Sequence, residues 1–365
     1  MNFEEARRLY AHEGPFATVY LVTPNDVEDA ATRLDLEWKN VRRDLAGADR
    51  ADDGTLAALD GEVAAGHGGG ETLAAVAAGG EVLYARRLPD PVVRSVGHWA
   101  PVPRLGPLFE WSQASLPHLV VLADREGADI VAFTPGNGTL DAAVDGDVEH
   151  LRRVAPGGWS QRRFQQRAEN TWEHNADKVA GSVATLCEEV NADLVVVAGD
   201  VRAVQFLGHA LPQRVRDRLR VLDHGQRAAG VSIEDIADDV VKHVATAVAE
   251  RTVAVLREFR EELGQHDRAV EGTAATFEAL ERAQVGTLLV HDDPDDERAA
   301  WFGPDATHAA LDRQTLLDMG VGDPRQDRMV DVALRAACGT SAEIRIVPGG
   351  GSPREGIGAI LRHTG

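Results

Sequence analysis

Five arginines lie in a stretch of sixteen residues that contains no acidic residue and has a Gly-Gly pair at its centre. Guanidinium groups pair with phosphates in a planar arrangement, and glycines let a backbone approach a partner closely. A helix starting at Ser160 would add unpaired N–H groups and a positive dipole end. The stretch predicts a site for an anionic polymer, with an ordinary hydrated loop as the alternative. The arginines are Arg152, Arg153, Arg162, Arg163 and Arg167.

The charge of the whole chain limits what this site can be. A formal net charge of -21 excludes a protein that coats nucleic acid non-specifically, because such binding needs dense positive surfaces. The chain has only three lysines, Lys39, Lys178 and Lys242, so nearly all of its positive charge is guanidinium. Composition alone favours an arginine-rich codon bias as the explanation, so the placement of the arginines carries the argument.

Length and composition predict a soluble, globular protein of two or three domains. The chain has 365 residues, is 44% hydrophobic and has no run of eighteen apolar residues, so no membrane association is expected. The opening MNFEEARRLY lacks the pattern of a secretion signal, which predicts a cytoplasmic location. Cys187 and Cys338 stand far apart in apolar helical patterns, which predicts two buried thiols rather than a disulfide or a metal site.

Hydrophobic periodicity divides the chain into three α/β blocks, of residues 1–117, 118–263 and 264–365. The first block contains a predicted strand in FATVYLVTP, helices over 26–45 and 54–65, and a hairpin in TLAAVAAGGEVLYARRLP. The pattern of the third block is helix then strand, twice over, which predicts a small sheet covered by helices. The first block is of uncertain type, and its residues indicate no function.

The second block begins with a predicted hairpin, HLVVLADREGADIVAF, and continues into the arginine-rich loop. Apolar residues at helical spacing predict a helix from Ser160 to Val190. The run ADLVVVAGD is typical of a strand buried on both faces, and RLRVLDHG predicts a further short strand. A capping box of Ser232 and Asp235 predicts the start of a second long helix that closes the block.

PGGWSQRRFQQR resembles the tip of the middle domain of the archaeo-eukaryotic class one release factors and their relative Pelota, where a Gly-Gly-Gln tip precedes a Ser and a basic helix. HLVVLADREGADIVAF and ADLVVVAGD resemble strands of that domain, and EALERAQVGTLLVHDD and EGIGAILRHTG resemble parts of the family's C-terminal domain. The resemblance covers about residues 118–365. It is strongest to the bacterial and archaeal branch that includes the Balon-type ribosome hibernation factors.

The resemblance implies an α/β multidomain protein: a ribonuclease-H-like middle domain and a C-terminal α/β/α domain like that of kink-turn-binding ribosomal proteins. It also implies ribosome and ribosomal RNA as partners, with a translational GTPase as a further partner. No cofactor, no metal and no DNA are expected. The implied tip loop comprises Gly157, Gly158, Trp159, Ser160 and Gln161.

Two departures from the family decide the predicted function. Trp159 stands where the release factors have Gln, and an indole offers one donor, no acceptor and much bulk. Hydrolysis needs a small polar group beside the ester and N–H groups for the oxyanion, and Gln161 lies two positions further on. The first block also lacks the Asn-Ile-Lys-Ser motif that reads stop codons. We therefore expect no catalytic residue and no hydrolysis of peptidyl-tRNA.

The predicted function is occupation of the ribosomal A site, for hibernation or rescue, with the five arginines on ribosomal RNA. Trp159 either stacks on an unpaired base or packs on its own helix. One alternative is a peptidyl-tRNA hydrolase or release factor with an altered tip. Another is a metal-dependent RNA nuclease using Asp124 and Asp200, for which two acids are too few. The acidic run HDDPDDE, residues 291–297, predicts a solvated turn rather than a metal loop.

Overall fold

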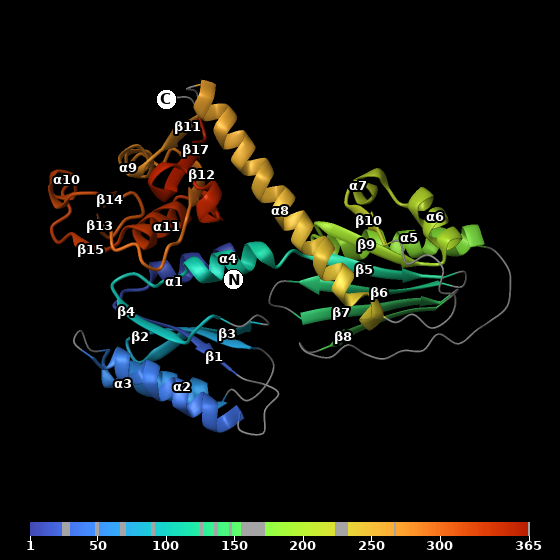
Figure 1. Cartoon of the computed structure of the whole chain (residues 1–365), viewed down its shortest axis with the longest axis horizontal. Coiled ribbons are helices and arrows are strands. Elements are labelled where there is room, and N and C mark those ends of the chain that lie inside the picture. Colours follow the sequence, from blue (N-terminus) through green and yellow to red (C-terminus); the bar gives the residue numbers. More distant parts are fainter. Residues whose placement is uncertain are drawn as a thin grey trace. The chain divides into compact units, whose positions relative to one another are not determined.

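The computed structural model describes residues 1–23, 30–47, 51–65, 71–88, 92–124, 127–134, 138–145, 148–154, 172–222, 233–265 and 268–363. Contacts divide the chain into two compact units (Figure 1). Unit 1 combines residues 1–111 with 252–365, and unit 2 consists of residues 112–251. The chain therefore has a multidomain α/β fold. The division into three blocks and their ribonuclease-H-like and kink-turn-binding assignments stay predictions.

The first segment of unit 1 is built on a four-stranded antiparallel sheet in the order β3-β2-β1-β4. One face of the sheet is covered by two helices, α2 (Ala30–Leu45) and α3 (Asp53–Ala65). Apolar residues of both helices pack against alternate positions of β1 and β2 in one hydrophobic core. The strands are β1 (Phe16–Val22), β2 (Thr72–Ala78), β3 (Glu81–Leu88) and β4 (Val96–Ala100).

The other face of this sheet packs against α1 (Phe3–Ala11), α4 (Gly106–Ala114) and the C-terminal segment of the chain. A single hydrophobic cluster contains Tyr20 and Val76 of the sheet together with Val332 and Leu334 of α11 (Met329–Gly339). Two segments that are far apart in sequence therefore share one core.

The C-terminal segment forms a second four-stranded sheet, in the order β11-β17-β12-β16. On one face lie α9 (Thr273–Glu281) and α11, and on the other lies the second half of α8 (Ile233–Gln265) through Leu256 and Phe259. This arrangement confirms the predicted sheet covered by helices. Its strands are β11 (Ala269–Glu271), β12 (Val285–Val290), β16 (Glu343–Ile346) and β17 (Ile357–Leu361).

Between β12 and α11 the chain forms a small three-stranded sheet in the order β14-β13-β15. One helix, α10 (Arg313–Asp318), completes it. Its small core joins Trp301 to Leu316 and Val321. The strands are β13 (Ala299–Phe302), β14 (Ala309–Ala310) and β15 (Arg325–Arg328). Two short 3-10 helices, Gly349–Gly351 and Arg354–Gly356, precede the final strand.

Buried charges join the two segments of unit 1. Arg104 donates from Nη1 to Oδ2 of Asp331 at 2.7 Å, and Nε of Arg328 donates to the same oxygen at 2.8 Å. Arg328 also pairs with Asp292, and Oδ2 of Asp327 accepts a hydrogen bond of 2.7 Å from the backbone N–H of Val102. Because Asp331 is fully buried, its two arginine partners supply the charge compensation that water cannot.

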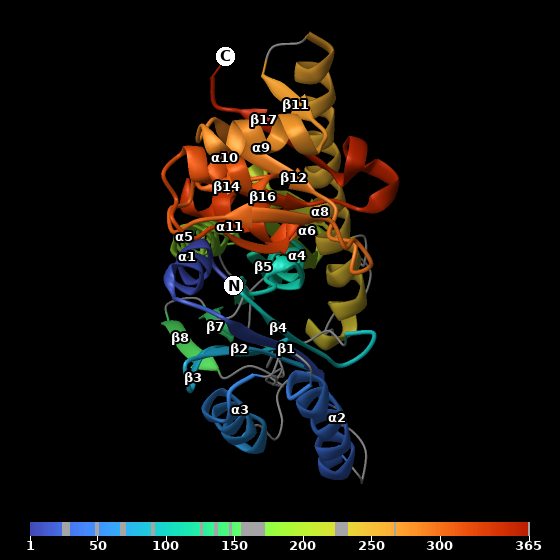
Figure 2. The ribbon, with the colours of Figure 1, turned by 90° about the vertical axis from the view of Figure 1, so that its left-hand side faces the viewer.

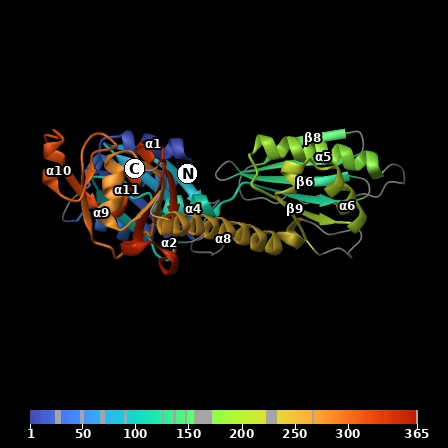
Figure 3. The same cartoon turned by 90° about the horizontal axis from the view of Figure 1, so that it is seen from above.

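Unit 2 is a three-layer α/β/α unit around a six-stranded sheet in the order β10-β9-β5-β6-β7-β8. On one face lie α5 (Trp172–Glu189), α6 (Val201–Ala210) and α7 (Gln213–Arg216), and on the other lies the first part of α8. Figure 3 shows α5 and α8 on opposite sides of the sheet. The strands are β5 (His118–Ala123), β6 (Gly127–Thr134), β7 (Gly138–Asp145), β8 (Val148–Val154), β9 (Leu194–Gly199) and β10 (Leu219–Val221).

Most elements predicted from periodicity are confirmed, including the hairpins β2–β3 and β5–β6 and the strand β9. Strand β9 pairs with a parallel neighbour on each side and is buried, as a continuous apolar run predicts. The predicted helix from Ser160 is described only from Trp172 onwards. Cys187 and Cys338 are buried and free, as expected. Within the described residues, no helix is long and apolar enough to cross a membrane.

Candidate functional site

The arginine-rich stretch begins on β8, the edge strand of the sheet in unit 2. Strand β8 pairs with β7, with Arg152 opposite Asp141 and Arg153 opposite Leu140. Two of the five predicted RNA-binding arginines therefore belong to the edge of a sheet rather than to a loop. The predicted tip residues Gly157, Gly158, Trp159, Ser160 and Gln161 lie outside the described residues, as do Arg162, Arg163 and Arg167.

The described flanks of residues 155–171 lie at opposite ends of the sheet. Before the gap, Val154 of β8 pairs with Thr139 of β7, which pairs with Phe133 of β6. Phe133 in turn pairs with His118, the first residue of β5, so Val154 lies at the end of the sheet where β5 begins. At the other flank the first turns of α5 lie beside Ala123, the last residue of β5. A strand of six residues spans roughly 20 Å. Val154 and the first turns of α5 are therefore separated by at least about the length of one strand.

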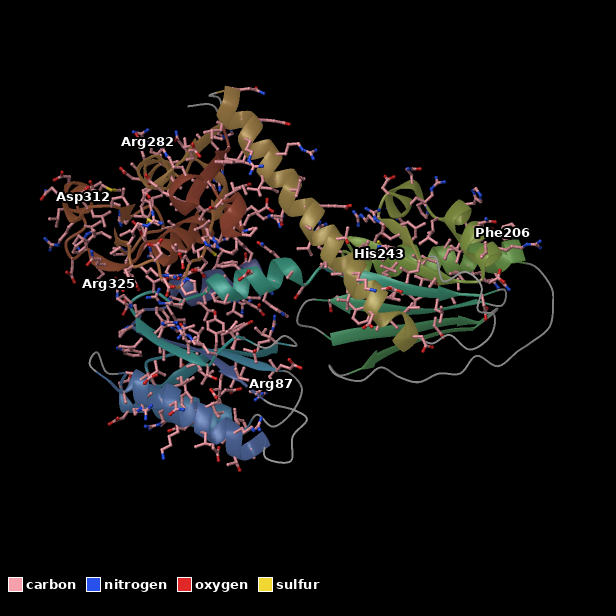
Figure 4. The ribbon with its side chains drawn as sticks, viewed as in Figure 1. Arg87, Phe206, His243, Arg282, Asp312 and Arg325 are labelled. Carbon is pink, nitrogen blue, oxygen red and sulfur yellow. The ribbon has the colours of Figure 1, made fainter. Side chains whose placement is uncertain are left out.

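A small pocket lies where α5 begins, at the carboxyl end of β5. Its lining is mainly apolar and includes Ala123 and Gly127 from the β5–β6 connection, with Val179 of α5 and Leu207 of α6. Phe206 of α6 lies at this pocket and is labelled in Figure 4. Asp124, Asn175, Ala176 and Ala203 complete the lining. The carboxyl ends of strands in open α/β sheets are common ligand sites.

Gly199 lets strands β5 and β9 come together at this end of the sheet. Its φ is +128°, and a Cβ atom there would lie 1.8 Å from the carbonyl oxygen of Ala123. Only glycine fits such a backbone position. The next residue, Asp200, donates its backbone N–H to the same carbonyl at 3.0 Å. Asp124 and Asp200 are thereby brought to the same end of neighbouring strands.

The two carboxylates are engaged in local structure. Asp200 caps α6 by accepting from the backbone N–H groups of Arg202 at 2.9 Å and Ala203 at 3.2 Å. Asp124 accepts from the backbone N–H of Gly127 at 2.9 Å. In the part of the chain that the structure describes, no group of three or more His, Cys, Asp or Glu residues could hold a metal ion. This geometry gives the nuclease alternative no support.

The acidic run of residues 291–297 follows β12 and is used in structural contacts. Asp292 pairs with Arg328. Asp296 forms a salt bridge of 2.6 Å with Arg298, whose guanidinium holds the pKa of that carboxyl below its usual range through hydrogen bonds. Asp293 accepts from the backbone N–H of Asp295 at 3.0 Å. These contacts are typical of a turn, as the sequence predicts, but the side chains of Asp292 and Asp296 are largely buried rather than solvated.

Sequence reasoning missed the hairpin of β7 and β8, which carries the start of the arginine-rich stretch. Alternating residues such as Leu140 and Val144, followed by Gly146-Asp147 and the β-branched Val148, are a hairpin signal that could have found it. It also missed the pocket, because its lining residues come from three elements whose proximity depends on sheet register. No local pattern marks such a site.

The middle of the chain matches a protein-family model. Residues 117–265 match the model of bacterial archaeo-eukaryotic release factor family 2. This match confirms the release-factor resemblance of the second block. The matched residues include all of β5 to β10, α5 to α7 and α8.

Similarity to individual proteins extends over the whole chain. The uncharacterized protein Rv2629 of Mycobacterium tuberculosis is 28% identical over 370 residues, which cover 100% of this chain and 97% of that protein. A model of ribosome-bound archaeal Pelota and ABCE1 is 14% identical, with a TM-score of 0.40, and covers 100% of this chain and 94% of its own. Dom34 of S. cerevisiae, a translation termination-like factor interacting with Hbs1, is 10% identical, with a TM-score of 0.38. That match covers 100% of this chain and 93% of the Dom34 chain.

Proposed function

Because residues 117–265 match the model of bacterial archaeo-eukaryotic release factor family 2, we propose that the protein binds the ribosome and occupies its A site. The role is hibernation or rescue of stalled complexes. The observation that carries the proposal is that the family segment contains the five-arginine stretch, from Arg152 to Arg167, in a chain of net charge -21. Delivery by a translational GTPase belongs to the same proposal.

Arginines are suited to the partner proposed. Ribosomal RNA presents a dense array of phosphates, and each arginine that neutralises one releases counterions and makes binding salt-dependent. Trp159 offers a flat aromatic surface on which an unpaired base stacks. The stretch is therefore a ribosomal RNA contact inside the A site.

Chemistry separates this role from peptide release. The family resemblance places Trp159 where a release factor has Gln, and indole has no acceptor and more volume than an amide. Without a small polar group beside the ester, we propose that the protein does not hydrolyse peptidyl-tRNA. A release factor in which Gln161 takes over the role is the second candidate, because Gln161 lies in the same loop.

Co-sedimentation with vacant ribosomes at two salt concentrations tests the proposal. We expect the wild-type protein to bind, and the Arg162→Glu/Arg163→Glu variant to bind at least about tenfold more weakly with an unchanged melting temperature. The matched control is Arg202→Glu/Arg216→Glu. It makes the same change in charge at two exposed positions of unit 2 and should bind like the wild type. Equal binding by all three proteins would refute the arginine contact.

The same preparations distinguish the second candidate. Ribosomes loaded with peptidyl-tRNA are mixed with wild-type protein, and the freed peptide is counted. We expect no release above the spontaneous rate. Rapid release that is lost in Gln161→Ala would show instead that the protein is a release factor with an altered tip.

A further inference from the structure

Helix α2 of unit 1 carries a cationic outer face. Arg33, Leu36, Lys39 and Arg43 are all exposed, and Leu36 keeps 57% of its surface. With 100° between successive residues, these positions fall on the side of the helix opposite its buried stripe. The face therefore combines three positive charges with an apolar side chain.

The acidic residues of α2 are rotated away from this face. Asp35, Glu37 and Asp44 lie on its flanks, about 90° or more from the outward direction. Arg43 lies within about 10° of that direction, Lys39 about 50° and Arg33 about 70° from it. The cation on the inner flank, Arg42, is already paired, through a salt bridge of 2.9 Å with Asp60 of α3. The outer face is thus positive although the whole chain is strongly acidic.

The three outward cations have no acidic partner among the residues that the structure describes. Arg33 and Lys39 form no ion pair, and Arg43 donates a single hydrogen bond of 3.2 Å to the side chain of Asn40. Many other arginines of unit 1, such as Arg282 with Glu278, form salt bridges. Unpaired cations held on one helical face are available to an external anion.

The neighbouring helix leaves room for a large partner. Helices α2 and α3 lie side by side on the sheet face that points away from α1 and α11 (Figure 2). Asp53, the first residue of α3, is exposed, and the other exposed positions of this helix, Gly54, Ala57, Gly61, Ala64 and Ala65, are all short and uncharged. Beyond its first residue, therefore, no exposed position of α3 carries an acidic or bulky side chain that hinders an approach to the cations of α2.

We infer that the outer face of α2, defined by Arg33, Leu36, Lys39 and Arg43, binds the phosphate backbone of RNA. Residues 33 and 43 are about 15 Å apart along the helix, so they reach separate phosphate groups. Charge complementarity identifies the occupant, because a polyanion gains most from three cations that lack internal partners. The inference rests on the proposed function: it adds a second ribosomal RNA contact, on unit 1.

The test measures binding to purified ribosomes and to protein-free ribosomal RNA over a range of salt concentrations. Variant Arg33→Glu/Arg43→Glu reverses two charges of the face. The control Arg257→Glu/Arg260→Glu makes the same charge change at two exposed positions of α8, also in unit 1. We expect the face variant to bind both targets at least about tenfold more weakly, with the log–log salt slope reduced by about two, and the control to match the wild type.

The outcomes separate the two proposals. Wild-type binding that the face variant keeps in full would overturn the α2 contact and leave the proposed function standing. Failure of the wild type to bind ribosomes would instead refute the proposed function, and the comparison on free ribosomal RNA would still decide the α2 contact. The α2 contact with RNA would also be overturned if the face variant lost ribosome binding but kept the wild-type salt slope and the wild-type binding to free RNA. In that case the face would contact ribosomal protein. Equal melting temperatures of all variants exclude unfolding as the cause.

Discussion

At the scale of single residues, Asp331 is the most deeply buried charged side chain that the structure describes. Burial raises the pKa of its carboxyl to about 6, although Arg328 and Arg104 oppose that shift. Desolvation therefore outweighs two hydrogen-bonded guanidinium groups. The folded protein holds this proton more tightly than an unfolded chain, in which the pKa is near the ordinary value.

The raised pKa of Asp331 predicts how stability depends on pH. Because the folded state binds the proton more tightly, the stability gained from this group is complete below about pH 4 and is lost as the pH rises through 6. We expect its contribution to the free energy of unfolding to increase by about 1 kcal/mol between pH 7 and pH 5. Urea denaturation at pH 7, 6 and 5 measures this.

The matched comparison uses two variants. Asp331→Asn should lose this part of the pH dependence, whereas Asp323→Asn, which alters an exposed carboxylate, should keep it. The same pH dependence in Asp331→Asn and in the wild type would show that another group takes up the proton.

At the scale of elements, the start of α6 depends on one side chain. Asp200 accepts from two backbone N–H groups of the first turn, which would otherwise have no partner within the helix. We expect Asp200→Ala to lower the free energy of unfolding by about 1 kcal/mol. Asp200→Ser should lose much less, because Ser also caps a helix. A similar loss in both variants, measured by urea denaturation, would mean that the cap contributes little.

The length and regularity of the apolar pattern in each element decided whether that element could be predicted from the sequence. Strands β5 and β9 are runs of Val, Leu and Ala long enough to show in sequence, and α8 shows its apolar stripe over many turns. Strands β13, β14 and β15 have two to four residues, too few to show a period. Strand β7 contains Thr139, Asp141 and two alanines, which weaken the apolar signal.

At the candidate site, sequence reasoning found the arginines from composition and order alone. It could not place Arg152 and Arg153 on an edge strand, because that position depends on the register of β7 and β8. Nor could it find the pairing of Asp200 with the carbonyl of Ala123, since the contact joins strands separated by some seventy residues. Local patterns predict elements, while register and long-range contacts determine sites.

At the scale of the whole molecule, unit 1 is folded from two segments that are distant in sequence. Leu105 from the first segment and Leu334 from the C-terminal segment lie in the same hydrophobic cluster, and both are fully buried. Gly106 packs so closely on Asp292 that a Cβ atom would lie 1.7 Å from its carboxylate oxygen. The stability of each segment should therefore depend on the other.

Hydrogen exchange of the intact chain tests this dependence. We expect Leu105→Ala to lower the stability of unit 1 by about 2–5 kcal/mol and to speed exchange of the slowest amides of α11, over two hundred residues away. The control Val183→Ala, in the core of unit 2, should speed exchange in its own helix, α5. Unchanged exchange in α11 of Leu105→Ala would show that the two segments fold separately.

Helix α11 has a consequence for the sequences that this fold accepts. All ten residues from Met329 to Cys338 are buried. The helix therefore has no exposed face on which a larger side chain could extend into water. Asp331 and Arg335, its two charged members, have partners in place, and Arg335 donates to the carbonyls of Gly303 and Pro304 at 2.9 and 2.6 Å. In a library of random variants, we expect this helix to accept little beyond exchanges between small apolar residues, a narrower choice than at any exposed stretch of the same length.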